Sequence, residues 1–190
     1  MRLDGLSFRV AATAIMVAIA GCKGGATGPV GNVNVTGAAE KGPFVLGTSI
    51  KGSPLDVKGL PTGKIFSSQI ASDRGEFALS ASPGAISIEG NGFFFNEVSG
   101  ALSEAPLTVR ALTELKATKT SRVFLNVLTH LAHDRALVLW KQRVEMQLAL
   151  KQAETEIRVA MPLGPAGSAI GDGSSITIME GNSTDAAYMF

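Results

Sequence analysis

Residues 66–95 read FSSQIASDRGEFALSASPGAISIEGNGFFF, and this stretch decides the fold class. Apolar and polar residues alternate in short runs, and the runs are separated by Asp, Asn, Pro and Gly residues at 73–75, 82–84 and 90–92. Alternation with a period of two predicts β-strands with one buried face, and the residues between the runs predict tight turns. We therefore expect consecutive antiparallel strands through this stretch.

The same pattern extends in both directions, from residue 35 to residue 115. Phe44 and Leu46 form one apolar pair before the central stretch, further turn residues fall at 51–54 and 61–63, and another alternating run follows at 107–111. Each such strand offers one apolar face, so two sheets are needed to bury all of them. The pattern predicts an antiparallel β-sandwich of roughly six or seven short strands over residues 35–115.

Within the sandwich, Ser72-Asp73-Arg74-Gly75-Glu76-Phe77 and Pro83-Gly84-Ala85-Ile86-Ser87-Ile88 resemble the hairpin and strand motifs of carboxypeptidase regulatory-like, transthyretin-like domains. Asp73 is suited to an Asx turn, Gly75 to a positive φ, and Phe77 to the core. The sequence departs from the family at Ala85-Ile86, where an aromatic residue is commoner. The resemblance implies a structural or recognition module with no catalytic residues of its own.

Beyond Ser121 the apolar period becomes helical, and it predicts a hairpin of two amphipathic α-helices over residues 120–161. Ser121 is a candidate N-cap. The first helix is expected to bury Phe124, Val127, Leu128, Leu131, Val138 and Leu139, with Asn126, His130 and His133 facing away. The second, from about Arg143 to Met161, is expected to bury Met146, Ala149, Leu150, Ala153, Ile157, Ala160 and Met161, and it ends before Pro162.

Three stretches, 92–98, 107–112 and 126–131, together resemble a family of uncharacterised bacterial lipoproteins that pair such a sandwich with a helical C-terminal half. That resemblance implies the architecture and no known activity. Residues 162–190 are expected to form a loop and a truncated C-terminal segment, because a helix that begins near Ser183 has too few residues to persist. We therefore expect a fragment, or a chain shortened relative to its relatives.

The N-terminus has the order of a bacterial secretory leader. Residues 1–21 hold Arg2 and Arg9 and then an apolar run from Val10 to Ala20. That run would rise only about 16 Å as a helix, roughly half a hydrocarbon core. The sequence Ile19-Ala20-Gly21-Cys22 resembles the lipobox of bacterial lipoproteins, which implies cleavage before Cys22 and lipid attachment to its thiol. The alternative is an ordinary secretory leader with a chance cysteine.

Lipid attachment would anchor the mature protein to a membrane. Acyl chains contribute about 0.8 kcal/mol per buried methylene group, so two or three chains anchor a protein stably. Lys23 follows the cysteine where lipoproteins of the inner membrane usually carry Asp, and this resemblance favours the outer membrane. Residues 22–34 are rich in Gly and are expected to be a flexible linker between the lipid and the domain.

Composition excludes several function classes. Removal of the leader leaves 15 basic and 15 acidic residues, and no basic cluster is present, which argues against a nucleic-acid partner. Cys22 is the only cysteine, so neither an intramolecular disulfide nor a thiolate zinc site is possible. The sequence contains no G-x-S-x-G elbow and no nucleotide-binding glycine motif. We expect no cofactor.

Four candidate sites, the first of which is a pair of histidines, have both a chemical and a structural interpretation. His130 and His133, followed by Asp134, have a spacing that could grip a metal, but two solvated histidines are the favoured interpretation. Arg135 projects into the apolar stripe and is expected to form a salt bridge. Phe94 is expected to lie under the helices, the alternative being an exposed aromatic that binds a glycan or a protein. Glu97 could be a catalytic acid, but it lacks an identifiable partner carboxylate.

The sequence therefore predicts a lipid-anchored cell-envelope protein, not an enzyme, with a structural or recognition role toward a protein or a polysaccharide. One alternative is an envelope metal-dependent hydrolase that uses His130 and His133. The other is a nonfunctional truncated member of its family.

Overall fold

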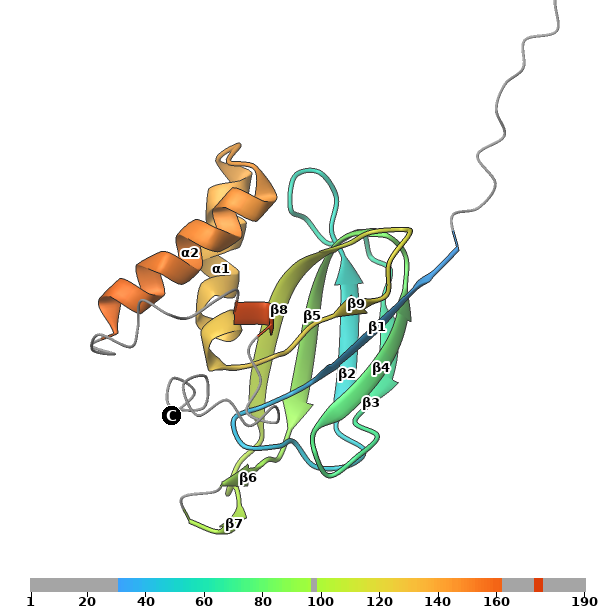
Figure 1. The fold of residues 1–190 in the computed structure, drawn as a ribbon, viewed down its shortest axis with the longest axis vertical. Helices are drawn as coiled ribbons and strands as arrows, with labels where there is room; N and C mark the ends of the chain where they lie inside the picture. Colours follow the sequence, from blue (N-terminus) through green and yellow to red (C-terminus); the bar gives the residue numbers. More distant parts are fainter. Residues whose placement is uncertain (1–30, 97–98, 162–172, 176–190) are drawn as a thin grey trace, which may run out of the picture.

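The fold is mainly β, with antiparallel sheets and two C-terminal helices (Figure 1). The computed structural model describes residues 31–96, 99–161 and 173–175. Its elements in chain order are β1 (Val33–Ala38), β2 (Ser49–Pro54), β3 (Phe66–Gln69), β4 (Glu76–Ala81), β5 (Gly84–Gly92), β6 (Phe95–Asn96), β7 (Ala101–Leu102), β8 (Leu107–Leu115), β9 (Ser121–Arg122), α1 (Val127–Lys141), α2 (Met146–Ala160) and the 3₁₀ turn η2 (Gly173–Ser175).

The strands form two main sheets and one small hairpin. One sheet has the order β4-β1-β9, the other β3-β2-β5-β8, and β6 pairs with β7. All pairs are antiparallel except β1 with β9. Alternate residues of both main sheets point into one shared apolar core, whose fully buried members include Val35, Ile50, Leu79, Ile86, Ile88 and Val109.

The sequence correctly places β3, β4, β5 and β8, because more buried and more exposed residues largely alternate along each of them. Residues 51–54 are a strand and not the expected turn: they belong to β2, which pairs with β5 along its whole length and with β3 as far as Gly52. Strand β1 begins at Val33, inside the segment expected to be linker. Phe44 is buried but makes only an isolated bridge to Phe94.

The turn before β4 shows why the Ser72–Phe77 motif requires a glycine at position 75. Gly75 has a φ of 73°, and an added Cβ there would lie 2.5 Å from the backbone oxygen of Ala39. Phe77 is 3% exposed in the core, as expected. The side chain that contacts the turn is Ser72 rather than Asp73, since the Ser72 hydroxyl accepts from the backbone N–H of Arg74 at 3.3 Å.

Two helices are present as predicted, but both begin later than the sequence suggests. Ser121 is not an N-cap, because it lies in β9 beside β1. The N-cap of α1 is the fully buried Asn126, which accepts from the backbone N–H of Thr129 at 2.8 Å and completes a reciprocal capping box. Glu145 caps α2 by accepting from the backbone N–H of Leu148 at 3.0 Å.

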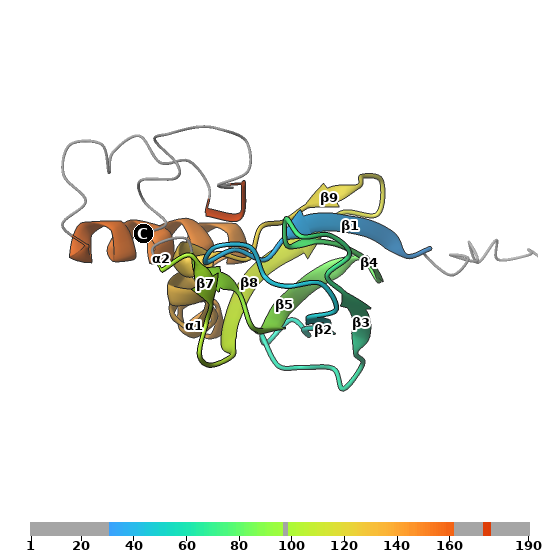
Figure 2. The same ribbon diagram turned by 90° about the horizontal axis from the view of Figure 1, so that it is seen from below.

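The predicted buried face of α1 is partly wrong. Leu131 and Val138 are 42% and 45% exposed, whereas His133 is only 4% exposed. The reason is the position of α1, which packs against β8 on one side and α2 on the other (Figures 1 and 2). The buried surface therefore includes Ala132, Ala136 and Leu139, and the more polar flank that carries His133 is turned toward the sheet.

The buried face of α2 matches its prediction closely. Met146, Ala149 and Ala153 are buried, and Leu150 and Ile157 pack against the same apolar cluster, although Ala160 is exposed. Arg135 forms the expected salt bridge, since its Nε lies 2.6 Å from Oε2 of Glu156 on α2. None of the helices in the described ranges has the length and apolarity needed to span a bilayer.

Candidate functional site

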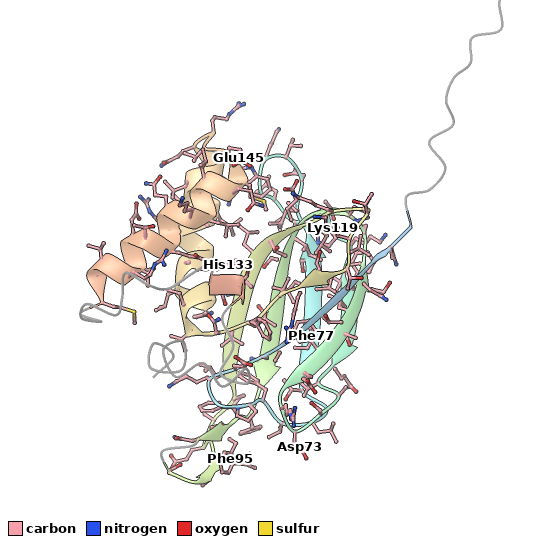
Figure 3. The ribbon with its side chains drawn as sticks, viewed as in Figure 1. Asp73, Phe77, Phe95, Lys119, His133 and Glu145 are labelled. Carbon is pink, nitrogen blue, oxygen red and sulfur yellow. The ribbon has the colours of Figure 1, made fainter. Side chains whose placement is uncertain are left out.

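A polar cluster around His133 joins α1 to the four-stranded sheet, and Figure 3 marks the place of His133 beside the sheet. The hydroxyl of Ser87 on β5 lies 2.8 Å from Nε2 of His133, and Nδ1 of His133 lies 2.8 Å from Oδ1 of Asp134. Arg110 on β8 donates to both carboxylate oxygens of Asp134 at 3.2 Å. We call Ser87, Arg110, His133 and Asp134 the helix–sheet clamp.

Burial and mutual hydrogen bonds set the charges of the clamp. Burial lowers the pKa of His133, and the hydrogen bond to Asp134 offsets part of that effect. The hydrogen bond from His133 holds the pKa of Asp134 below its usual value, with a further contribution from the charge of Arg110. At neutral pH the ring is therefore uncharged, Nδ1–H donates to Asp134, and Nε2 accepts from the Ser87 hydroxyl.

The order of these three groups is that of a Ser-His-Asp triad, but their setting opposes nucleophilic catalysis. Ser87 lies in the middle of β5, opposite Ser53 of β2 and Leu112 of β8, so the backbone N–H groups around it serve the two ladders and are unavailable to an oxyanion. His133 is almost wholly buried, and Asp134 is already neutralised by Arg110. The arrangement fixes the helix on the sheet.

The metal hypothesis finds no geometric support in the described ranges. His133 has both ring nitrogens hydrogen-bonded to protein, and no group of three or more His, Cys, Asp or Glu side chains there could hold an ion. His130 is nearby, and burial lowers its pKa; its buried Nδ1 has no partner within those same residues. The expectation that both histidines are solvated is wrong for His133.

The three consecutive phenylalanines divide between core and surface. Phe94 packs in the sheet core, with its ring centroid 5.9 Å from that of Phe44, and not under the helices as expected. Phe93 and Phe95 are 43% and 42% exposed, and Phe95 pairs across the β6–β7 hairpin with Leu102, which is 58% exposed. We call Phe93, Phe95 and Leu102 the apolar tip.

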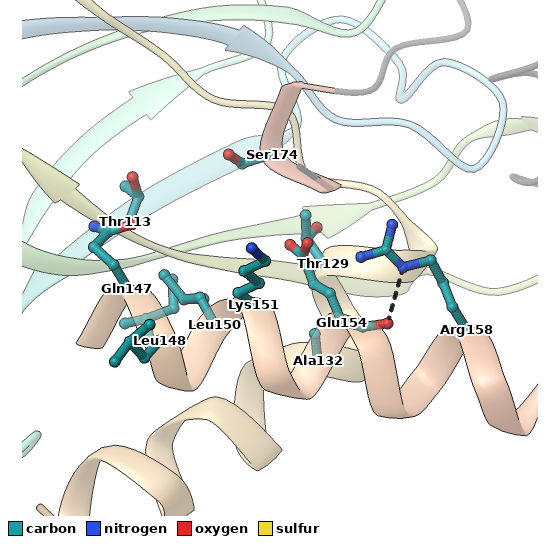
Figure 4. A pocket seen from close by; sticks show the side chains of 11 residues that line it. Thr113, Thr129, Ala132, Gln147, Leu148, Leu150, Lys151, Glu154, Arg158 and Ser174 are labelled. Atoms are coloured by element: carbon teal, nitrogen blue, oxygen red, sulfur yellow. Dashed lines mark hydrogen bonds between the residues drawn. The ribbon is translucent and has the colours of Figure 1, made fainter. Parts of the chain in front are cut away.

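A cavity of about 490 Å³ lies between α2, the start of α1 and β8 (Figure 4). Leu112 of β8 and Ala132 of α1 line it, together with Leu148, Leu150, Lys151 and Arg158 of α2. Ser174 of η2 lines it as well, and η2 is held in place by Asn126, whose amide donates to the backbone oxygen of Gly173 at 2.8 Å.

Sequence reasoning missed most of the residues that the structure brings together. Ser87 and Arg110 join His133 and Asp134 only because β5, β8 and α1 meet, and no short motif encodes that meeting. The available signal was the strand period, which places Ser87 and Arg110 on the outer face. Cys22, Glu97 and the segment 162–190, apart from η2, lie outside the described residues.

No family model, no curated protein and no solved structure matches this chain.

Proposed function

We propose that this protein is a lipid-anchored component of a bacterial cell envelope, most consistent with the outer membrane, with a non-catalytic role in recognising a protein or a polysaccharide. The lipobox-like sequence that ends at Cys22 supports the location. The apolar tip lies at the opposite end of the fold from the start of β1 (Figure 1). The N-terminal tether therefore leaves this end of the domain free for contact with a partner.

The exposed apolar tip is the observation that carries the recognition role. Phe93 and Phe95 alternate along the chain, so their side chains leave the same side, and Leu102 faces Phe95 across the hairpin. A contiguous group of large apolar side chains on a surface typically marks a contact site, and aromatic residues are enriched at such sites. Phe94, anchored in the core beside Phe44, holds the backbone of the tip in place.

We also propose that the two main sheets form a transthyretin-like sandwich of the carboxypeptidase regulatory-like kind. The shared core between the sheets supports this, as do the turn at Gly75 and the buried Phe77. Domains of that kind act as structural or recognition modules. The helix–sheet clamp, in which the buried His133 and its partners hold α1 on the sheet, is consistent with such a role.

Binding experiments test the recognition role and identify the class of partner. Lipidated protein in liposomes would be sedimented with purified peptidoglycan, and separately photocrosslinked in intact cells from a reactive residue at position 101, an exposed position next to Leu102 in the β6–β7 hairpin. We expect either retention on the polysaccharide or one discrete protein adduct. Phe93→Ser with Phe95→Ser should abolish it, while Val57→Ser with Val159→Ser, at positions 90% and 82% exposed, should not.

Two results would contradict the proposal. Equal retention and crosslinking with the tip variant and the control variant would remove the apolar tip from recognition. Labelling of Ser87 by a fluorophosphonate, lost in His133→Ala, would show that the clamp is a working nucleophile and that the protein is not a passive module.

A further inference from the structure

The cavity beside α2 has the shape of a groove. Its α2 wall runs from Gln147 to Arg158, a span of roughly 16 Å at the rise of an α-helix. The opposite wall combines β8, the start of α1 and η2 (Figure 4). Its volume of about 490 Å³ falls within the range of pockets that bury a small molecule.

Four of the described lining residues are apolar, two at the base of the groove and two on α2, and the other seven are polar or charged. Leu112 and Ala132 close the base and are 3% and 1% exposed. Leu148 and Leu150 stand on the α2 side, and Leu148 is 60% exposed although it lines the groove. A chain of methylene groups in contact with these four side chains would remove apolar surface from water on both the ligand and the protein.

Basic side chains outnumber acidic ones in the lining of the groove. Lys151 and Arg158 line it about two turns apart on α2, and Figure 4 shows both side chains rising from the helix toward η2. Glu154 is the only acidic lining residue of the described chain, and its carboxylate accepts from the backbone N–H of Gly173 at 3.1 and 3.2 Å. Lys151 has no ion-pair partner within that part of the chain.

We propose that this groove binds a single-chain amphiphile with an anionic headgroup, its alkyl chain along Leu112, Ala132, Leu148 and Leu150 and its headgroup beside Lys151. The shared chemistry is a carboxylate or phosphate on an acyl-length chain, which a free fatty acid or a lipid fragment could supply. This ligand goes beyond the protein or polysaccharide partner proposed for the apolar tip, and its site contains none of the residues of that tip. Either proposal can therefore fail without the other.

Displacement of a fluorescent fatty acid tests the proposal. The full chain carrying Cys22→Ser, which cannot be acylated, would be titrated in detergent-free buffer with dansyl-undecanoic acid. Laurate, dodecyl phosphate and dodecyltrimethylammonium would then be added as competitors below their micelle concentrations. We expect saturable binding, displacement by laurate, by dodecyl phosphate or by both, and at least about tenfold weaker displacement by the cation. The anion that displaces better identifies the preferred headgroup.

Matched variants locate the ligand in the groove. Leu148→Trp should fill the cavity and abolish binding, whereas Val159→Trp, on α2 but outside the lining, should not. Lys151→Glu should weaken binding by about fivefold or more, as expected for loss of a partly exposed ion pair, whereas Lys141→Glu should leave it unchanged. All four positions lie on the protein surface, two of them at the rim of the groove. Thermal unfolding would confirm that each variant is folded.

Three outcomes would overturn the proposal. The first is no saturable binding of the probe to a folded protein. The second is equal displacement by anionic and cationic amphiphiles, which would leave only non-specific apolar contact. The third is identical affinity for Leu148→Trp and Val159→Trp, which would place the probe elsewhere.

Discussion

Substitution of Ser87 by Ala should destabilise the protein by about 2 kcal/mol. His133 is 4% exposed, and its Nε2 accepts a hydrogen bond from the Ser87 hydroxyl at 2.8 Å. The variant removes the hydroxyl and leaves a buried ring nitrogen without its hydrogen bond, which costs about 1–3 kcal/mol. For a domain of this size the loss corresponds to a fall in melting temperature of roughly 5–10 °C.

Urea unfolding at pH 7.5, followed by circular dichroism, measures this effect. Ser53→Ala is the matched control, because Ser53 lies opposite Ser87 on β2, is similarly half-buried and makes no side-chain hydrogen bond within the described residues. We expect the control to change the free energy of unfolding by less than about 0.5 kcal/mol. In a His133→Phe background, Ser87→Ala should also cost little, because no ring nitrogen then needs a partner.

Equal unfolding free energies for Ser87→Ala and Ser53→Ala would refute the clamp. So would an undiminished cost of Ser87→Ala in the His133→Phe background, since the loss would then arise from packing of the serine itself. Either result would reopen the question of what the Ser-His-Asp order does in this protein.

Three further predictions concern the cap, an ion pair and a close contact. Asn126→Ala should cost about 2 kcal/mol in urea unfolding, since it removes a buried N-cap. Hydrogen bonds from Arg135 lower the pKa of Glu156 from 4.5 to about 2. The contribution of this pair to stability is therefore complete above about pH 4.5 and is lost as the pH falls through 2. In Arg135→Ala, an NMR titration should show the pKa of Glu156 return toward 4.5. Gly37→Ala should cost about 3 kcal/mol by thermal unfolding, because the new Cβ would lie 1.7 Å from the backbone oxygen of Val123.

Much of the sheet could be predicted because strand periodicity is a local signal. Phe77 with Leu79, and Ile86 with Ile88, alternate within one strand, and each is buried as expected. Strand β2 was missed because Gly52 and Pro54 usually mark a turn. Gly52 fits in β2 because the sheet opposite leaves no room for a side chain there. A Cβ at this position would lie only 2.8 Å from the Leu79 side chain.

The helical half shows where local reasoning ends. Ser121 has the chemistry of an N-cap, but its pairing with Val35 of β1 places it in a strand instead. Helical projection finds one apolar stripe on α1, whereas the helix has two buried flanks, one against α2 and one against β8. His133 lies on the second flank, so its burial and its contact with Ser87 depend on an assembly that no single segment encodes.

The intact mass of membrane-extracted protein from a bacterial host, wild type beside Cys22→Ser, tests the central claim most directly. We predict that the wild type lacks residues 1–21 and carries added acyl mass, and that the variant carries neither change. An unacylated, soluble wild-type product would contradict the claim of a lipid-anchored envelope protein.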